Sequence, residues 1–431
     1  MRDLSVFIIY LTPLSLLPEP EIQSIMLSLP DDIITFMLNV KLLSRKDLIS
    51  ISLLNKDYRK RFEPILFDRI KLTWSQLNST SNCSDAKQKL SLQKSLHRYF
   101  ESFMYKDLVS FIRVHSDMNN FKQTSYGEWN TDLSPLNDCK FLKGLAIEVL
   151  TSSRCLKYQS ALERSQIVSL RICSHSTTDD NASLFQLTHI STHFPNVSKL
   201  TLEGFLIDKD QYFMPSLNNS GKLSKLRDIT LVNCQWEYPL SLFDIFCPFY
   251  NHSSLYTTSK TPEIIQPTSL CLKYTNSYSS FVLRERFKTF INTTADKVGS
   301  FKSYPAFYSN LKHLEISILN EEYHTHTSEY YYPNLSWLDL TARFAEDSSS
   351  SLINNLKSLK LIGWRVNNLE LINQLFGSAF KPGTLERFSL YRVDDTDYPG
   401  NREIYALIDS LVNKPFLCHC KISVRYVNEL M

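Results

Sequence analysis

The sequence predicts an α+β repeat protein with three parts: a module of three short helices, a helical linker region, and an α/β solenoid with a curved parallel sheet. Three patterns support this fold class. Apolar residues recur at helical spacing within 29–67, helical periodicity returns at 85–115, and a Leu-x-x-Leu-x-Leu unit repeats from about residue 167. The expected regions are an extension at 1–25, the helical module at 26–72, the linker at 73–165 and the repeats at 166–431.

The N-terminal extension is apolar over residues 4–17. This run is shorter than a membrane-spanning helix, and Pro13 interrupts it. No clean signal-peptide cleavage site follows it. Three interpretations stay open: a packed or partner-binding extension, a targeting or membrane-surface segment, and untranslated sequence ahead of a start at Met26.

The module at 26–72 has the signals of three helices. Pro30 suits the first turn of a helix, and the acidic Asp32 complements the helix dipole there. Ser44 can cap a second helix, with Asp47 three residues later. A third apolar set follows, with Pro64 opening its last segment. Three helices this short cannot bury their apolar faces alone, so we expect a partner or a neighbouring domain. An ordinary helical hairpin within a larger core is the alternative.

These residues resemble the F-box family. The resemblance covers about a tenth of the chain and includes Leu-Pro at 29–30, Asp-Leu at 47–48 and Pro-Ile-Leu-Phe at 64–67. It implies docking onto the Skp adaptor of cullin–RING ubiquitin ligases through the first helix and the loop after it. The residues that the resemblance assigns to the adaptor interface are Leu29, Pro30, Asp32, Ile33, Ile34, Asp47, Leu48, Leu53 and Tyr58.

The repeat units read as short strands with an apolar residue at every second position. In Leu-x-Leu both leucines point to one side of a strand and the residue between them points to the other. Stacked units of this kind form a parallel sheet over a continuous core. The pattern resembles a divergent leucine-rich-repeat protein, with insertions at 232–268 and 273–310. An unrelated α/β domain with leucine-rich strands is the alternative. The expected units are 167–172, 197–202, 226–231, 269–272, 311–316, 335–340, 356–361, 385–390 and 421–424.

Composition narrows the function classes. The chain is 43% hydrophobic and 21% charged, as in soluble globular proteins, and its net charge of +3 gives no strong footprint for nucleic acid. The low Gly content (9 residues) beside many Asn and Ser residues is fungal-like. Nine cysteines without a Cys-x-x-Cys motif favour a reducing compartment, cytoplasmic or nuclear. Cys418-His419-Cys420 and His324-x-His326 lack further nearby ligands, so we expect no metal. No catalytic or nucleotide-binding motif occurs, so we expect no cofactor and no enzymatic activity.

An F-box followed by leucine-rich repeats is a recurring architecture of ubiquitin-ligase substrate receptors. The resemblance therefore implies the Skp adaptor, with cullin and RING subunits beyond it, and an unknown protein target on the repeat surface. A modest surplus of Lys and Arg on that surface suits an acidic or phosphorylated target. An adaptor-binding scaffold outside a ligase, at a kinetochore or an organelle, is the alternative. The expected target-binding residues are Trp337, Arg387, Tyr391, Lys360 and Lys199.

Overall fold

The computed structural model describes the strands of a long sheet, the helices ahead of them and parts of the connecting segments. The described residues are 45–54, 56–73, 105–115, 136, 139–149, 166–174, 183–185, 190, 194–207, 223, 225–236, 246, 265–275, 310–319, 355–365, 384–393, 409 and 419–426.

Two helices open the described part of the chain: α4 (Arg45–Leu54) and α5 (Lys56–Phe67). Leu48 of α4 and Phe62 of α5 are fully buried, as the helical spacing of apolar residues predicts. Ser44, the predicted cap of the second helix, lies outside the described residues. Pro64 lies inside α5, so the expectation that it opens a separate segment was wrong. The first predicted helix, near 29–40, lies outside the described residues.

An 11-stranded parallel sheet follows α5 after the single residue Asp68. The strands pair in chain order, apart from short strands that belong to a second sheet. A short 3-10 helix, η2 (Lys106–Leu108), precedes the second strand. The strands of the large sheet are β1 (Arg69–Thr73), β2 (Phe111–His115), β3 (Gly144–Val149), β4 (Ser169–Ser174), β6 (Lys199–Glu203), β8 (Asp228–Val232), β10 (Ser269–Thr275), β11 (His313–Leu319), β12 (Ser358–Arg365), β13 (Arg387–Val393) and β14 (Lys421–Tyr426).

Two apolar ladders run across this sheet. The parallel register places Leu200 of β6 beside Leu170 and Ile229, and Leu202 beside Ile172 and Leu231. The same pairing of apolar residues two positions apart continues from β1 to β14. All ladder side chains from β3 to β13 are buried. Burying one such side chain contributes roughly 1.5–3 kcal/mol, so the ladders are a main source of stability.

A third apolar column precedes the strands and completes the Leu-x-x-Leu-x-Leu pattern. Ile167, Val197, Leu226 and Leu311 in this column are all buried. The residue between this column and the strand links neighbouring units through its carbonyl oxygen. The Arg227 carbonyl, for example, accepts hydrogen bonds from the Thr268 and Ser269 amides at 2.7 and 3.1 Å. Each repeat unit is therefore tied to the next before its strand begins.

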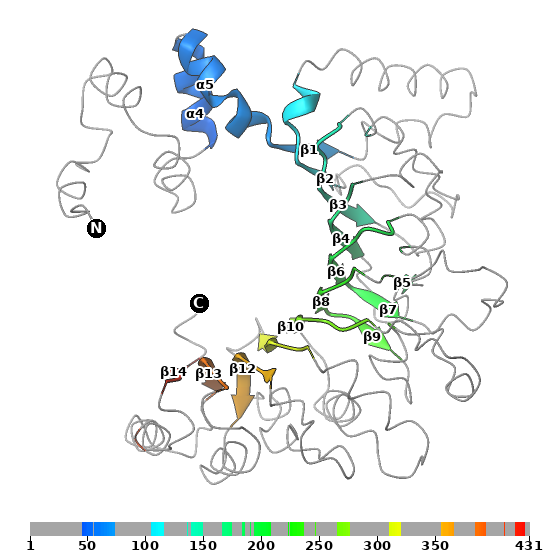
Figure 1. Cartoon of the computed structure of the whole chain (residues 1–431), viewed down its shortest axis with the longest axis vertical. Coiled ribbons are helices and arrows are strands. Elements are labelled where there is room, and N and C mark those ends of the chain that lie inside the picture. The colour runs from blue at the N-terminus through cyan, green and yellow to red at the C-terminus, as the bar shows by residue number, and fades with distance from the viewer. Residues whose placement is uncertain are drawn as a thin grey trace, which may run out of the picture.

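Left-handed residues turn the chain after two of the strands. Gly204 (φ 75°) follows β6 and Asn233 (φ 50°) follows β8, and both residue types tolerate this backbone region better than others do. After these residues the chain enters β7 (Phe205–Ile207) and β9 (Gln235–Trp236), respectively. Together with β5 (Ser183–Phe185) they form a second, three-stranded parallel sheet. This small sheet lies on the outer side of the large one (Figure 1).

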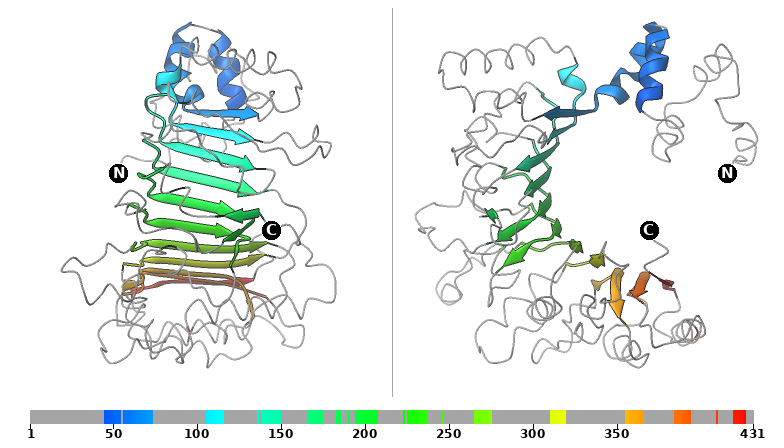
Figure 2. Two further views of the ribbon diagram at one scale, coloured as in Figure 1. Left: turned by 90° about the vertical axis from the view of Figure 1, so that its right-hand side faces the viewer. Right: turned by 180° about the vertical axis from the view of Figure 1, so that it is seen from behind.

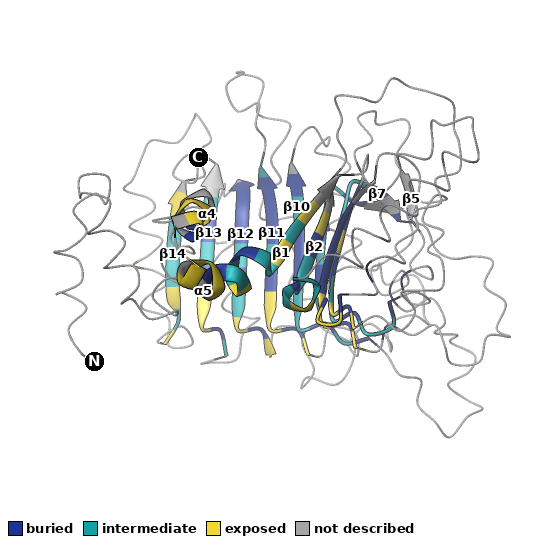
Figure 3. Ribbon diagram, turned by 90° about the horizontal axis from the view of Figure 1, so that it is seen from above, coloured by how far each residue is buried: buried dark blue, intermediate teal, exposed yellow. Residues whose placement is uncertain are grey.

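The strands from β1 to β14 follow an arc, with α4 and α5 at one end and β14 at the other (Figures 1 and 2). A curved, parallel, repeat-like sheet is what the repeat pattern predicts, and this part of the prediction is confirmed. Burial is uneven along the arc. Strands β10 to β12 are mostly buried, whereas the side chains of residues 421–425 in β14 are intermediate or exposed (Figure 3).

Three expectations about the elements were wrong. The linker region at 73–165 was expected to be helical, but Phe111 and Ile112 lie in β2 and residues 144–149 form β3. The repeat sheet therefore begins at Arg69, well before residue 166. The repeat unit expected at 335–340 would form a strand between β11 and β12. These two strands pair directly, so the sheet has no strand between them. Residues 335–340 themselves lie outside the described residues.

Candidate protein-interaction surfaces

The inner face of the sheet is the side opposite the apolar ladders. Its residues come from alternate positions of each strand and form three columns across the arc. The first column is Arg69, Phe111, Gly144, Ser169, Lys199, Asp228, Ser269, His313, Ser358, Arg387 and Lys421. The second is Lys71, Arg113, Ala146, Arg171, Thr201, Thr230, Cys271, Glu315, Lys360, Ser389 and Ser423. The third, from β3 onward, is Glu148, Cys173, Glu203, Val232, Lys273, Ser317, Ile362, Tyr391 and Arg425.

Basic residues outnumber acidic ones on this face. The acidic positions are Glu148, Glu203, Asp228 and Glu315, one on each of four strands between β3 and β11. The basic positions extend from β1 to β14, and the last three strands have no acidic residue in these columns. A surface of this kind raises the local concentration of negatively charged partners. The basic positions are Arg69, Lys71, Arg113, Arg171, Lys199, Lys273, Lys360, Arg387, Lys421 and Arg425.

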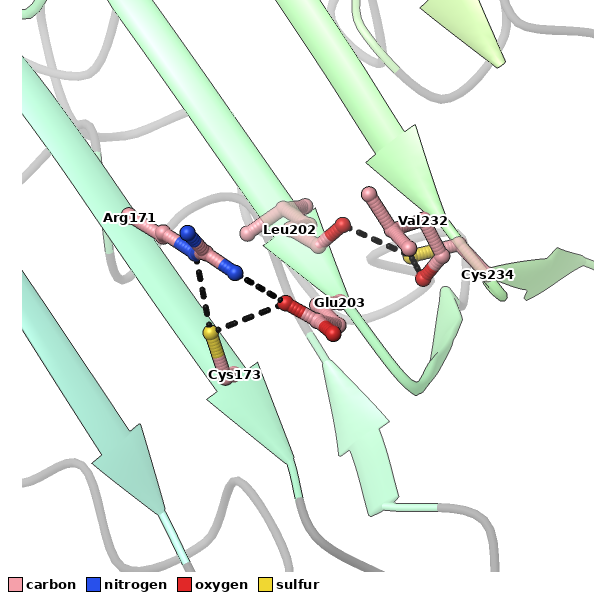
Figure 4. A network of polar contacts seen from close by, with 6 residues as sticks. All are labelled: Arg171, Cys173, Leu202, Glu203, Val232 and Cys234. Atoms are coloured by element: carbon pink, nitrogen blue, oxygen red, sulfur yellow. Dashed lines mark hydrogen bonds and ion pairs between the residues drawn. The ribbon is translucent and has the colours of Figure 1, made fainter. Parts of the chain in front are cut away.

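In the middle of the arc, the carboxylates of Glu203 and Glu315 are paired with basic side chains. Arg171 Nη2 lies 2.7 Å from Glu203 Oε2, and the Cys173 thiol donates to the same oxygen at 3.2 Å (Figure 4). The hydrogen bond to Glu203 raises the pKa of Arg171. Burial, with the Glu203 charge beside it, raises the pKa of Cys173 to about 12. The ion pair and the hydrogen bond therefore hold these three side chains in place. The Cys173 thiol stays neutral, whereas a nucleophilic cysteine has to be a thiolate.

Two neighbouring sites resemble this cluster. In one the charges are paired, and in the other a cysteine thiol is enclosed. Glu315 Oε1 lies 3.6 Å from Lys273 Nζ and 3.3 Å from Lys360 Nζ, so one carboxylate faces a lysine on each adjacent strand. Cys234 is fully enclosed, with its sulfur 3.4 Å from the carbonyl oxygens of Leu202 and Val232 (Figure 4). Burial raises the pKa of Cys234 to about 12.

The two last strands differ from the middle of the arc. Arg387 of β13 lies directly opposite Lys421 of β14, and Tyr391 lies opposite Arg425. We call Arg387, Lys421 and Arg425 the C-terminal basic patch. All three are exposed, and no ion pair links any of them to an acidic group among the residues that the structure describes.

At the other end of the arc, a cavity of about 520 Å³ lies between the two helices and β1. We call it the helix groove. Ile49 and Leu53 line it from α4, one helical turn apart, and they are 46% and 67% exposed. A groove with large exposed apolar side chains is typical of a protein-docking site. Its other lining residues are Ser52, Arg59, Leu66, Phe67, Arg69, Ile70, Lys71 and Tyr105.

The helices are joined firmly to the sheet. The Phe67 and Tyr105 rings stack with centroids 3.9 Å apart, and the Tyr105 hydroxyl donates to Glu63 at 2.8 Å. This hydrogen bond raises the pKa of Tyr105. The hydroxyl of Ser110 donates to the carboxylate of Asp68, the one residue between α5 and β1. These contacts tie α5 to the segment that leads into β2.

The structure brings some of the predicted site residues together. Lys360, Arg387 and Tyr391 lie on the neighbouring strands β12 and β13, whereas Lys199 lies on β6, with three strands between β6 and β12. Lys421 was missed, although it occupies the same column as Arg387 and its alternation in Lys-Ile-Ser-Val could have revealed it.

The adaptor-interface residues fall into three groups. Leu53 is exposed in the helix groove, and Leu48 is fully buried, where it packs the helix pair from within. Asp47 and Tyr58 lie within α4 and α5. The predicted residues outside the described ones are Leu29, Pro30, Asp32, Ile33, Ile34 and Trp337.

No group of three or more metal-ligating side chains lies together among the described residues. Likewise, none of the described helices is long and apolar enough to cross a membrane. Comparison with known proteins gives no family assignment: no protein-family model matches the chain, and no curated protein matches it.

Proposed function

We propose that this chain is the substrate-recognition subunit of an SCF-type cullin–RING ubiquitin ligase. The helix pair and the segment before it dock the Skp adaptor, and the inner face of the solenoid holds a target protein. The observation that carries the proposal is a short helix pair with an exposed apolar stripe, joined by one residue to an open repeat surface.

The helix groove supplies the adaptor contact. Leu53 and Ile49 are more than one-third exposed and lie next to a cavity of about 520 Å³. A partner that covers such side chains removes apolar surface from water, which stabilises the complex by roughly 25 cal/mol per Å² of buried apolar surface. The F-box resemblance of the sequence around these residues supports the Skp adaptor as the partner.

The inner face supplies the target contact. Its columns present charged and aromatic side chains such as Arg387 and Tyr391, which are residue types that dominate protein interfaces. In this proposal the chain performs no chemistry of its own. It raises the ubiquitin-transfer rate by holding the target near the catalytic subunits, with which it is linked through the adaptor and the cullin.

The test is a pull-down of the full chain from cells, probed for the Skp adaptor and for a cullin. A Leu53→Asp variant places a charge in the helix groove, and a Leu29→Ala/Pro30→Ala variant alters the start of the F-box. We expect both variants to lose both partners. The matched control is Val168→Asp, because Val168 is also exposed and apolar (41%) but lies just before β4, outside the helix groove.

Each result has a distinct meaning. Loss of adaptor and cullin in Leu53→Asp and in Leu29→Ala/Pro30→Ala, with retention in Val168→Asp, supports the ligase assignment. Recovery of the adaptor without a cullin would favour the scaffold function, and failure to recover the adaptor with the unmodified chain would overturn the proposal.

A further inference from the structure

The large sheet ends in an open edge at β14. In every earlier unit, from Asp68 to Glu386, the carbonyl just before the strand accepts a hydrogen bond from an amide of the next unit. Cys420 occupies this position in the last unit, and no amide of the described residues donates to its carbonyl oxygen. Strand β14 is also the last strand in the order of the sheet, so its outer edge has no neighbour within the described part of the chain.

Parallel pairing determines which backbone groups lie on this edge. The Lys421 amide donates to the Glu386 carbonyl of the preceding unit at 2.8 Å. Because the hydrogen bonds of a parallel strand alternate between its two neighbours, every second residue from Lys421 onward bonds to β13. Ile422 and Val424 therefore direct their N–H and C=O groups away from β13. A further strand would meet donors and acceptors at these two residues.

The apolar ladders are incomplete at the same edge. Ile422 and Val424 continue the two ladders, opposite Phe388 and Leu390 of β13. Every ladder side chain from β3 to β13 is buried, but Ile422 and Val424 are only half-buried. A strand added to β14 would cover both side chains and would also satisfy the outward backbone groups. Extended peptides are recognised in this way at exposed sheet edges, where the main chain supplies affinity and alternate side chains supply specificity.

The charges along β14 indicate which kind of strand fits. Lys421 and Arg425 are exposed on the inner face, and neither forms an ion pair among the described residues. A second copy of this chain, paired antiparallel with Ile422 opposite Val424, would place Lys421 opposite Arg425. Like charges directly opposite each other destabilise a sheet, whereas opposite charges stabilise it. A strand with carboxylates on its inner face is therefore a better partner than a second copy.

We propose that the open edge of β14 binds an extended peptide segment of a partner protein, in which branched apolar residues alternate with residues that include glutamate or aspartate. The apolar side chains cover Ile422 and Val424, the carboxylates face Lys421 and Arg425, and the backbone continues the sheet. This inference does not depend on the proposed ligase function, because the helix groove and the adaptor take no part in it.

The test uses the full chain and a short fluorescent peptide of alternating valine and glutamate with both ends blocked. The comparison peptides are one of the same composition in two blocks and one of alternating valine and lysine. Binding is measured by fluorescence anisotropy. We expect the alternating valine–glutamate peptide to bind about tenfold or more tightly than either comparison peptide. The block order cannot separate apolar and acidic side chains onto two faces, and lysines repel the basic side chains of β14.

Methylation of the peptide nitrogens tests for main-chain pairing. One peptide is methylated at its valine nitrogens and a second at its glutamate nitrogens. Because the amides of a strand point alternately to its two edges, only one of these sets faces β14. Exactly one methylated peptide should therefore lose about tenfold or more in affinity. Loss with the glutamate set indicates a parallel strand, and loss with the valine set an antiparallel one. Equal affinity of the two methylated peptides would overturn the inference.

Two double variants and one single variant locate the site. Lys421→Glu/Arg425→Glu reverses the charge of the edge, so the valine–lysine peptide should now bind more tightly than the valine–glutamate peptide. Lys71→Glu/Lys199→Glu makes the same charge change on β1 and β6 and should keep the original preference. Val424→Pro removes an outward N–H without removing a hydrogen bond to β13, and it should weaken binding about tenfold. Thermal unfolding verifies that all three variants fold.

Two results with these variants would contradict the proposed site. One is an unchanged peptide preference in Lys421→Glu/Arg425→Glu, and the other is a reversed preference in Lys71→Glu/Lys199→Glu. Sedimentation of the free chain addresses the other occupant of the edge. A dimer that Val424→Pro dissociates would assign the edge to a second copy of the chain and overturn the peptide proposal.

Discussion

Gly363 is the position where a single methyl group should be most costly. It adopts φ 74° at a bulge in β12, and a Cβ built there lies 1.8 Å from the Ile318 carbonyl oxygen of the neighbouring strand. The left-handed backbone alone costs an L-residue about 1–2 kcal/mol, and the clash requires strand β11 or β12 to move. We expect Gly363→Ala to lower the free energy of unfolding by about 3 kcal/mol or more, measured by urea denaturation.

Gly144 is the matched comparison, since its added Cβ meets a side chain instead of backbone. The Cβ would lie 2.5 Å from Cδ2 of Phe111, a ring over which the Arg69 guanidinium lies at 5.6 Å. A ring can rotate away more cheaply than a hydrogen-bonded strand can shift. Gly144→Ala should therefore lose less stability than Gly363→Ala, and the reverse order would contradict this account.

The described cysteines should be poorly reactive in the folded protein. Burial raises the pKa of Cys173, Cys234 and Cys271 to about 12, and that of the half-exposed Cys420 to about 11. Because the thiolate is the reactive form, iodoacetamide at pH 8.5 should leave Cys173, Cys234 and Cys271 unmodified until denaturant is added. Peptide mapping by mass spectrometry measures this. Rapid labelling of Cys234 in native protein would show that its site opens.

The raised pKa values of these thiols also make the free energy of unfolding depend on pH. Each folded thiol has a pKa above the ordinary value of 9.0, so between about pH 9 and 12 the folded state binds more protons than the unfolded state. Stability contributed by these thiols is complete below pH 9 and is lost as the pH rises through this range. Cys234→Ala should reduce the slope of unfolding free energy against pH. An unchanged slope would mean that other groups dominate.

At the scale of elements, the apolar ladders predict which face of a strand matters for stability. Leu202 is fully buried in β6, whereas its chain neighbour Thr201 lies on the inner face. Leu202→Ala should lower the free energy of unfolding by about 2–5 kcal/mol, and Thr201→Ala by no more than about 0.5 kcal/mol. Similar losses for both variants in denaturant titrations would contradict the register.

The strands of the large sheet from β4 onward were predictable because polar and apolar residues alternate in them, whereas β5, β7 and β9 of the small sheet were not predicted. Lys199-Leu-Thr-Leu-Glu203 is such a strand. The strand Gly144–Val149 does not show a clear alternation of polar and apolar residues. Its inner-face positions are occupied by Gly144 and Ala146, where polar residues would have indicated a strand. In β2, Phe111 and Ile112 continue the helical spacing of Leu108, so local periodicity favours the wrong element. Pairing with β1 and β3 overrides that local preference.

The interaction surfaces were predicted less completely than the strands. Period-2 alternation placed Arg387, Tyr391 and Lys360 on one face, and the structure agrees. The pairing of charges across strands depends on register between segments far apart in the sequence. Glu315 contacts Lys360 across a separation of 45 residues, while Arg387 has Lys421 opposite it. No local pattern distinguishes these two cases, so which charges face each other across strands becomes visible only in the folded sheet.

At the scale of the whole molecule, the helix groove and the inner face belong to one continuous structure. One residue separates α5 from β1, and the stack of Phe67 on Tyr105 with the hydrogen bond from Ser110 to Asp68 anchors that junction. In the proposed ligase, the distance from adaptor to bound target is therefore set by the sheet and not by a flexible linker. A fixed distance favours transfer to particular lysines of the target.

Inserting Gly-Ser-Gly-Ser between Phe67 and Asp68 tests whether this rigid junction matters. The insertion keeps the exposed α4 side chains Ile49 and Leu53 and the inner face, but it separates the helices from the β1 wall of the helix groove. Adaptor binding through the exposed α4 side chains and target binding should each persist, and a pull-down checks both before the rates are compared. It makes the helix pair a mobile attachment, because Gly-Ser segments behave as flexible coils. We expect the rate of ubiquitin transfer to the target to fall several-fold in a reconstituted ligase assay, with the modified lysines spread more widely. The same four residues inserted at the Asn- and Ser-rich segment 217–221 control for insertion itself and should leave the rate unchanged. An equal rate and an unchanged lysine pattern in the junction variant would mean that the solenoid acts only as a tether, with its curvature serving target binding alone.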